Sequence, residues 1–318
     1  MAIGEFDLIK KYFTAIGPVS SVALAVGDDC ALLDLPADQQ LATSVDTLVA
    51  DVHFPAQGDP ELIAQKALRC NLSDLAACGA QPLAFTLALT LPDADENWLE
   101  HFACGLRACA EEFAIPLIGG DTTRGAQRVI TIEVLGCVPR GKALLRSGAK
   151  PGDRIYVSGT LGDARAALDV LATPVVQLNN EQRYWLKRYY MPRPRVALGM
   201  ALRGIASAVI DISDGLAGDL GHILDRSGVG AVLNASALPI SDAMRVSADA
   251  LSFALSGGDD YELCFTVPAT KENQLGALAQ RLQVRLTCIG EITAATTLIL
   301  KSADGSESPL IAGGYQHF

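Results

Sequence analysis

Carboxylates occur in this chain within apolar segments, where a buried strand or helix ordinarily carries none. In the segment LATSVDTLV, residues 41–49, Asp46 interrupts the pattern of a buried strand. Because side chains alternate along a strand, Ser44 and Asp46 point to one face, and Val45 points to the other. A buried carboxylate costs several kcal/mol unless it is paired or binds a metal. For one such residue, an edge strand with a solvated carboxylate is the simpler interpretation.

The same placement recurs along the chain, next to Gly, Ser or Thr at the edges of apolar elements. The candidate carboxylates are Asp28, Asp29, Asp46, Asp74, Asp121, Asp211 and Asp214. Taken singly, Asp28 is an ordinary turn residue and Asp214 a helix cap. As a set they favour a metal site, and oxygen-only ligands suit Mg²⁺. The four histidines show no zinc-ligand spacing.

Two glycine-rich segments predict turns that could bind an anion. Gly119-Gly120-Asp121 follows a predicted strand at 115–118, and Gly257-Gly258-Asp259-Asp260 precedes one. Both turns would expose backbone N–H groups to a phosphate. The chain has neither a P-loop nor a G-x-G-x-x-G motif, so nucleotide binding would depend on metals and on cations such as Arg146. The simpler alternatives are a solvated loop residue for Arg146 and a surface histidine for His53.

Length and composition narrow the classes of protein. The 318 residues suggest two domains or one large one, and a chain that is 50% hydrophobic can bury a substantial core. The net charge of −11 argues against a nucleic-acid partner, but divalent cations could reverse the local charge for a phosphorylated substrate. Eight cysteines without a C-x-x-C pair predict buried free thiols. With no signal peptide or membrane span visible, we expect a cytoplasmic protein.

The order of elements predicts an α+β first half and an α/β second half. The first half reads strand–strand–helix–strand–helix–strand–strand, which predicts a mostly antiparallel sheet with helices on one face. Its main elements are expected at 41–49, 61–77, 85–91, 96–113, 115–118 and 129–138. A loop-like boundary follows at 141–152. The second half is expected to have strands at 154–158, 208–212, 261–267, 287–292 and 298–300, and helices at 163–171, 180–189, 216–225 and 271–282.

Seven motifs together resemble the thiamine-monophosphate kinase family, which belongs to the aminoimidazole ribonucleotide synthetase-like superfamily. They occur in the family's order and span nearly the whole chain. The motifs are GDDCALL (27–33), SVDTLVADVHF (44–54), NLSDLAACGA (71–80), LIGGDTTRG (117–125), RSGAKPGD (146–153), IDISDGL (210–216) and SGGDDYEL (256–263).

This resemblance implies a two-domain fold and a reaction. Residues 1–138 would form an ATP- and Mg²⁺-binding domain that also makes a homodimer, and residues 150–318 an α/β domain that closes the active-site cleft. ATP would be the co-substrate and thiamine monophosphate the acceptor, and several Mg²⁺ ions would assist direct in-line transfer to give thiamine diphosphate. The acceptor is a phosphate that is largely ionised at pH 7, so no general base is needed.

The resemblance also implies roles for individual residues. Metal ligands would be Asp29, Ser44, Val45, Asp46, Asp74, Asp121, Asp211 and Asp214, of which Asp46, Asp74 and Asp121 are catalytic. Val45 stands where the family often has Thr and could contribute its backbone carbonyl. Gly120, Asp121, Arg146 and Ser213 would contact ATP. His53, Asp259 and Tyr315 would contact the thiamine phosphate, although Asp259 replaces the family's usual Glu.

Two alternatives differ from this assignment. The first is another ATP-using enzyme of the superfamily, such as aminoimidazole ribonucleotide synthetase or selenophosphate synthetase. His53, Asp259 and Tyr315, on the substrate side, distinguish a thiamine-monophosphate kinase from these enzymes. The absence of a reactive Cys or Lys near the N-terminus argues against selenium chemistry. The second is a non-catalytic Mg-nucleotide-binding module, which would bind ATP without turnover.

Overall fold

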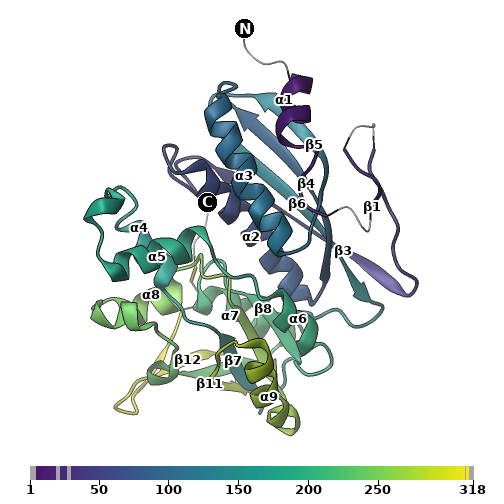
Figure 1. Ribbon diagram of the computed structural model, residues 1–318. Coiled ribbons are helices and arrows are strands. Elements are labelled where there is room, and N and C mark those ends of the chain that lie inside the picture. Colours follow the sequence, from purple (N-terminus) through teal and green to yellow (C-terminus); the bar gives the residue numbers. More distant parts are fainter. Residues whose placement is uncertain (1–4, 19–21, 27–29, 312, 315–318) are drawn as a thin grey trace. The chain divides into compact units, whose positions relative to one another are not determined.

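The computed structural model describes residues 5–18, 22–26, 30–311 and 313–314 (Figure 1). Contacts between residues divide the chain into two compact units. The first contains residues 1–75 and 80–141, and the second contains residues 76–79 and 142–318.

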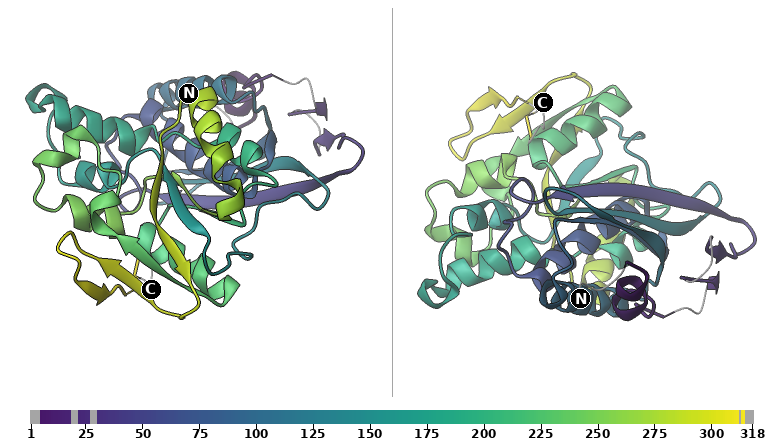
Figure 2. Two further views of the ribbon diagram at one scale, coloured as in Figure 1. Left: turned by 90° about the horizontal axis from the view of Figure 1, so that it is seen from below. Right: turned by 90° about the horizontal axis from the view of Figure 1, so that it is seen from above.

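The first unit is built on a four-stranded sheet. Its strands lie in the order β3 (Gln39–Val49), β6 (Val129–Pro139), β4 (Gln81–Leu91) and β5 (Leu117–Arg124). β6 is antiparallel to both of its neighbours, while β4 and β5 are parallel. Helices α1 (Glu5–Tyr12), α2 (Pro60–Cys78) and α3 (Glu96–Glu112) lie on one side of the sheet, as Figures 1 and 2 show. β1 (Val22–Leu24) and β2 (Leu32–Leu33) form a separate pair.

The two faces of this sheet differ in burial. On the face toward the helices, Leu48, Leu87 and Ile132 are buried. On the opposite face, Leu41 and Val45 are 46% and 59% exposed. Hydrogen-bonded polar pairs cross that face: Thr43 to Glu133, Thr47 with Thr131, and Thr90 with Thr123. We call this second surface the open face. Ser44 and Asp46 are half-buried, whereas Val45 is exposed on the open face, so the predicted alternation along this strand is confirmed.

One turn predicted in the first unit is wrong. The strand expected at 115–118 continues as β5 to Arg124, so Gly119 and Gly120 lie within a strand. The reason is close packing, because a Cβ at Gly120 would lie 1.8 Å from the carbonyl oxygen of Leu87 on β4. β4 also begins at Gln81 rather than at residue 85. The predicted starts of α2 and α3 are confirmed, since Asp59 and Asp95 accept hydrogen bonds from the first backbone N–H groups.

The second unit contains a seven-stranded sheet with helices packed against it. In sheet order the strands are β13 (Glu307–Pro309), β12 (Leu298–Lys301), β9 (Gly230–Asn234), β11 (Leu286–Thr293), β7 (Arg154–Ser158), β10 (Leu263–Val267) and β8 (Ala208–Asp211). Among these described strands, only β9 and β12 pair in parallel. The helices are α4 (Asp163–Leu168), α5 (Asn180–Tyr190), α6 (Val196–Leu202), α7 (Leu216–Ser227), α8 (Ala250–Ser256) and α9 (Asn273–Leu282).

The core of the second unit explains the apolar periodicity of its elements. Ile155, Ile210 and Cys264 on neighbouring strands are buried together with Leu220 and Ile223 of α7. Strands β9 and β13 and helix α8 were not predicted. All eight cysteines are free, as predicted, but the prediction that they are buried is wrong for Cys30, Cys104 and Cys288, which are exposed. No helix in the described part of the chain is long and apolar enough to cross a membrane.

Candidate active site

The first unit brings three of the predicted residues together on the helix-covered side of its sheet. Ser44 and Asp46 lie on β3, and Asp74 lies on α2. The Ser44 hydroxyl donates a 2.6 Å hydrogen bond to the Asp74 carboxylate. The backbone N–H of Asp46 donates to Oδ1 of Asn71, one turn before Asp74, over 3.1 Å. These contacts fix the edge of β3 against α2.

Asn71 is a residue that the sequence reasoning missed. Its side chain is fully buried, and its amide also donates to the carbonyl of Ala67 over 2.9 Å. It therefore connects the helix backbone to the strand that carries Asp46. The available signal was an Asn within the apolar helix pattern three residues before Asp74.

β3 is an edge strand, as the simpler interpretation of Asp46 required. Its outer edge nevertheless lies against α2, and Asp46 is half-buried rather than freely solvated. The desolvation cost is thereby lower than in a central strand, while the carboxylate stays within the polar group of Ser44 and Asp74.

Asp121, His53 and Arg146 lie elsewhere. β5 pairs Asp121 with Ala88, and the alternation that places Thr123 beside Thr90 puts Asp121 on the open face. His53 follows β3, and its Nδ1 accepts the backbone N–H of Val49 over 3.0 Å. Arg146 is exposed in the loop before β7.

The second unit brings together another group, at the end of β8. Asp211 closes this strand and is 4% exposed, and Ser213 and Asp214 follow it in the turn before α7. The helix-cap interpretation of Asp214 is wrong, because α7 begins without a side-chain cap. Instead, the Asp219 carboxylate accepts the backbone N–H groups of Asp214 and Gly215, each over 3.1 Å.

Asp219 is a second polar residue that the sequence reasoning missed. It is 3% exposed in the first turn of α7. Burial, followed by the nearby charge of Asp214, raises the pKa of Asp219 to about 7. Its hydrogen bonds hold the turn that presents Ser213 and Asp214. An acidic residue in the first turn of a predicted helix was the available signal.

The second glycine-rich segment lies against this turn. We call residues 257–262 the GGDDYE loop. The backbone N–H groups of Asp259 and Tyr261 donate to the carbonyls of Ser213 and Ile212, each over 2.8 Å. The N–H of Gly257 donates to Phe253. The predicted role of the loop as a phosphate cradle is therefore wrong for these three N–H groups, while Asp259 and Ser213 are brought side by side.

A buried ionic cluster lies behind the GGDDYE loop. Arg195 donates to both oxygens of Glu262 over 2.6 Å, and Arg188 donates to one of them over 3.1 Å. Both oxygens of Asp260 accept the N–H of Gly162. Sequence reasoning missed this cluster, because Arg188 and Arg195 lie 74 and 67 residues from Glu262 in the chain.

The C-terminal segment reaches the same place. A Cβ at Gly314 would lie 2.8 Å from the carbonyl oxygen of Asp214. The predicted residue Tyr315 follows directly but lies outside the described residues, as do Asp28 and Asp29.

The donor atoms of both groups fit a hard cation. Carboxylate and hydroxyl oxygens are the protein ligands that Mg²⁺ prefers. Within the described ranges, no three His, Cys, Asp or Glu side chains gather closely enough to hold a metal alone. This arrangement suits Mg²⁺ bound with a phosphorylated ligand, because such sites use one or two carboxylates together with phosphate oxygens.

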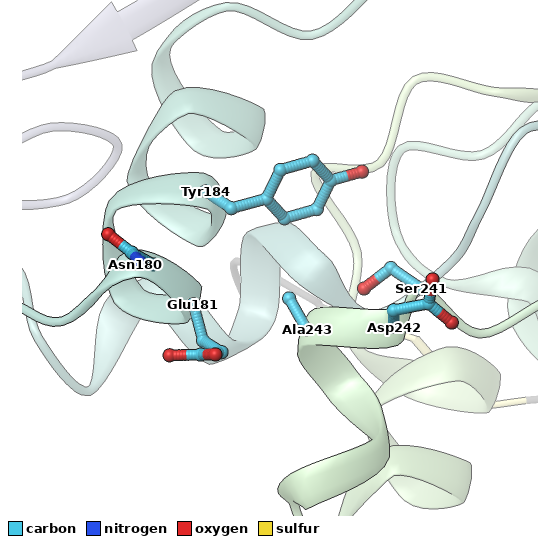
Figure 3. A pocket seen from close by; sticks show the side chains of 6 residues that line it. All are labelled: Asn180, Glu181, Tyr184, Ser241, Asp242 and Ala243. Carbon is cyan, nitrogen blue, oxygen red and sulfur yellow. The ribbon is translucent and has the colours of Figure 1, made fainter.

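A pocket of about 390 Å³ lies elsewhere in the second unit (Figure 3). It is lined by residues at the start of α5 and by 241–243, with the Tyr184 ring between these segments. Its lining comprises Asn180, Glu181, Tyr184, Ser241, Asp242 and Ala243. None of the predicted site residues belongs to this set.

Comparison with protein families gives two matches that together span most of the chain. Residues 27–138 match the N-terminal domain of the AIR synthase related proteins, and residues 150–301 match their C-terminal domain.

Comparison with individual proteins gives full-length relatives. The chain is 50% identical over 323 aligned positions to the thiamine-monophosphate kinase of Salmonella typhimurium, covering 100% of this chain and 99% of that protein. The crystal structure of thiamine-monophosphate kinase from Stenotrophomonas maltophilia K279a matches at 45% identity with a TM-score of 0.85, covering 91% of this chain and 93% of that one. A structure of AaThiL complexed with AMPPCP and TMP matches at 28% identity with a TM-score of 0.80, covering 100% and 99%.

Proposed function

This chain belongs to the AIR synthase related protein family and, within it, to the thiamine-monophosphate kinases, and we propose that it phosphorylates thiamine monophosphate with ATP to give thiamine diphosphate and ADP. The observation that carries the proposal is the full-length match to a curated thiamine-monophosphate kinase. The relative complexed with AMPPCP and TMP supports the same pair of substrates. The two carboxylate groups supply the chemistry that the reaction requires.

We propose direct in-line transfer, in which an oxygen of the acceptor phosphate attacks the γ-phosphorus and the bond to the bridging oxygen of ADP breaks. The acceptor oxygen is largely ionised at pH 7, so the protein need not remove a proton. The task of the side chains is to align two highly charged phosphate groups and to balance their charge.

We propose that the two carboxylate groups hold Mg²⁺ together with phosphate oxygens. Ser44, Asp46 and Asp74 would act from the first unit, and Asp211 and Asp214 from the second. Bound Mg²⁺ would neutralise charge on the phosphates and stabilise the transferred group. Asp29, Asp121 and the Val45 carbonyl remain proposed ligands from the resemblance alone.

Substrate contacts are proposed on a narrower basis. Ser213 is proposed to contact ATP, and Asp259 the thiamine phosphate; their backbones are already hydrogen-bonded to each other. Gly120, Asp121 and Arg146 are proposed ATP contacts, and His53 and Tyr315 are proposed contacts of the acceptor. The backbone N–H of Val49 donates to Nδ1 of His53 over 3.0 Å, which holds the imidazole ring beside the end of β3.

We also propose that the protein is a cytoplasmic homodimer. The open face supports the dimer, because Leu41 and Val45 expose apolar surface beside paired threonines on a regular sheet. Eight free cysteines fit a reducing compartment.

The proposal is tested by incubating the purified protein with ATP, Mg²⁺ and thiamine monophosphate. Oxidation to fluorescent thiochromes and chromatography separate the phosphorylated forms. We expect a thiamine diphosphate peak that disappears with EDTA, and no phosphorylation of unphosphorylated thiamine, whose hydroxyl would need a base. ATP binding by calorimetry without a product peak would reject the proposed acceptor and favour another member of the superfamily or a binding module.

A further inference from the structure

The GGDDYE loop has an unusual backbone. Gly258, Asp259 and Tyr261 all have positive φ angles, of 71°, 60° and 49°. Residues other than glycine rarely adopt this region, and they remain there only when surrounding contacts hold them. Two such residues within three positions therefore require an external support.

The strained backbone has a definite consequence for the candidate site. It directs the N–H groups of Asp259 and Tyr261 to the carbonyls of Ser213 and Ile212 at 2.8 Å. The approach is close, because a Cβ at Gly258 would lie 2.8 Å from the Ser213 oxygen. The loop is thereby held against the segment that carries two of the proposed ligands.

A second set of contacts holds Glu262, at the end of the loop. Its side chain is fully buried and accepts hydrogen bonds from Arg195, Arg188 and the Ser158 hydroxyl, the last over 2.5 Å. Burial opposes ionisation, but the charge and hydrogen bonds of Arg195 hold the pKa of Glu262 below its ordinary value. A bidentate arginine fixes both the position and the orientation of a carboxylate.

Neighbouring segments are shaped to fit this ion pair. At Gly159, with φ of 61°, a Cβ would lie 2.1 Å from Oε1 of Glu262 and 2.8 Å from Nη2 of Arg195. The Ser158 hydroxyl, which donates to Glu262, also accepts the backbone N–H of Leu263. The backbone on the β10 side of the loop is thus fixed by the same cluster.

We propose that Arg195, acting through Glu262, is a positioning residue that sets Asp259 beside Ser213 for recognition of the acceptor, an inference that rests on the function proposed above. Arg195 does not touch a substrate in this account. It restricts the GGDDYE loop to one backbone conformation, and that conformation places Asp259.

A double-mutant cycle separates positioning from a general contribution to stability. Arg195→Met keeps a long, unbranched side chain but removes the charged guanidinium group with its two hydrogen bonds to Glu262. Asp259→Asn removes the carboxylate that is proposed to be positioned. We expect Arg195→Met to raise KM for thiamine monophosphate on the order of tenfold in the wild-type background, and less than about twofold when Asp259→Asn is present. An equal factor in both backgrounds would overturn the proposal.

Two further variants control this experiment. Arg154→Met breaks the exposed ion pair with Glu291 in the same sheet, at 2.5 Å, and should leave KM unchanged. If Arg195→Met does not fold, Arg195→Lys keeps the charge but loses the guanidinium group. Measured below the melting temperature of the variant, Arg195→Lys should raise KM for thiamine monophosphate by a smaller factor than Arg195→Met. This increase should again disappear when Asp259→Asn is present. An increase that remains in the Asp259→Asn background would contradict the positioning role.

Hydrogen exchange tests the same inference without turnover. In folded Arg195→Met, the amides of Asp259 and Tyr261 should exchange faster, while amides of α7 remain as in the wild type. Unchanged exchange in the loop, or an equal increase throughout the second unit, would overturn the proposal. A wild-type protein that forms no thiamine diphosphate would reject the proposed function, and the exchange result would still decide the positioning role.

Discussion

The two groups of carboxylates are held in different ways. In the first unit, Asp46 and Asp74 lie on a strand and a helix, and one side-chain hydrogen bond from Ser44 links the two elements. In the second unit, Asp214 and Asp259 lie in turns, and their positions depend on Asp219 and on the buried pair of Arg195 with Glu262. Regular elements fix side chains through their own backbone bonds, whereas these two turns are held by side chains outside them, one nearby in the chain and one pair far apart.

Removal of charge from the first group should have the largest effect. We expect Asp46→Asn and Asp74→Asn each to lower kcat by about 100-fold or more, because each removes a carboxylate proposed to help balance phosphate charge. The thiochrome assay measures turnover, and circular dichroism checks the fold. Asp95→Asn, at the cap of α3, is the matched control and should retain normal turnover. A near-normal kcat for both Asp46→Asn and Asp74→Asn would reject the proposal that these carboxylates hold Mg²⁺.

The corresponding change in the second group sharpens the comparison. Asp211→Asn should lower kcat by roughly 10- to 100-fold or more, because loss of a proposed ligand should cost at least as much as the 10- to 100-fold that loss of a ligand's supporting partner costs. The same assay is run at saturating ATP and thiamine monophosphate. If turnover is unaffected while Asp46→Asn is inactive, the two groups do not serve one reaction.

Glycine packing in the first unit provides a stability test. Gly120→Ala would force a Cβ against the Leu87 carbonyl, and we expect unfolding to be easier by about 1–3 kcal/mol. Gly119→Ala is the matched control, because nothing lies within 4 Å of its added Cβ. Urea denaturation measures both. Equal stability of the two variants would show that close strand packing does not explain Gly120.

The open face gives the smallest expected effect. Leu41→Lys should raise the dissociation constant of the proposed dimer about tenfold or more, because association through the open face would bury an unpaired charge. Val176→Lys, at an 86% exposed position in the second unit, is the control. Light scattering across a concentration series measures the mass. A dimer unaffected by Leu41→Lys would place the interface elsewhere.

The sequence predicted features of the first group from local pattern. Strand alternation placed Ser44 and Asp46 on one face, and the helices expected to begin at 61 and 96 begin at Pro60 and Glu96. The glycines of β5 were misread, because the signal for a turn and the signal for close strand packing are the same residue type. Only the pairing with Leu87, far away in the chain, distinguishes them.

The sequence predicted less of the second group for the same reason. Arg195 and Glu262 are 67 residues apart, so no local pattern joins them. Asp219 was overlooked because it accepts hydrogen bonds from the turn that precedes its own helix. In the sequence, Asp214 of that turn was the obvious candidate for the helix cap. Motif resemblance implied roles for Asp211, Ser213 and Asp259, but it did not indicate which residues hold them in place.

The claim that both groups serve one metal-assisted transfer is tested most directly by the Mg²⁺ dependence of thiamine diphosphate formation. Wild type, Asp46→Asn and Asp211→Asn are compared across a Mg²⁺ titration at fixed, saturating ATP. We predict that each variant needs about tenfold or more Mg²⁺ for half-maximal turnover. If either variant follows the Mg²⁺ dependence of the wild type, its group does not hold Mg²⁺ and the account is contradicted.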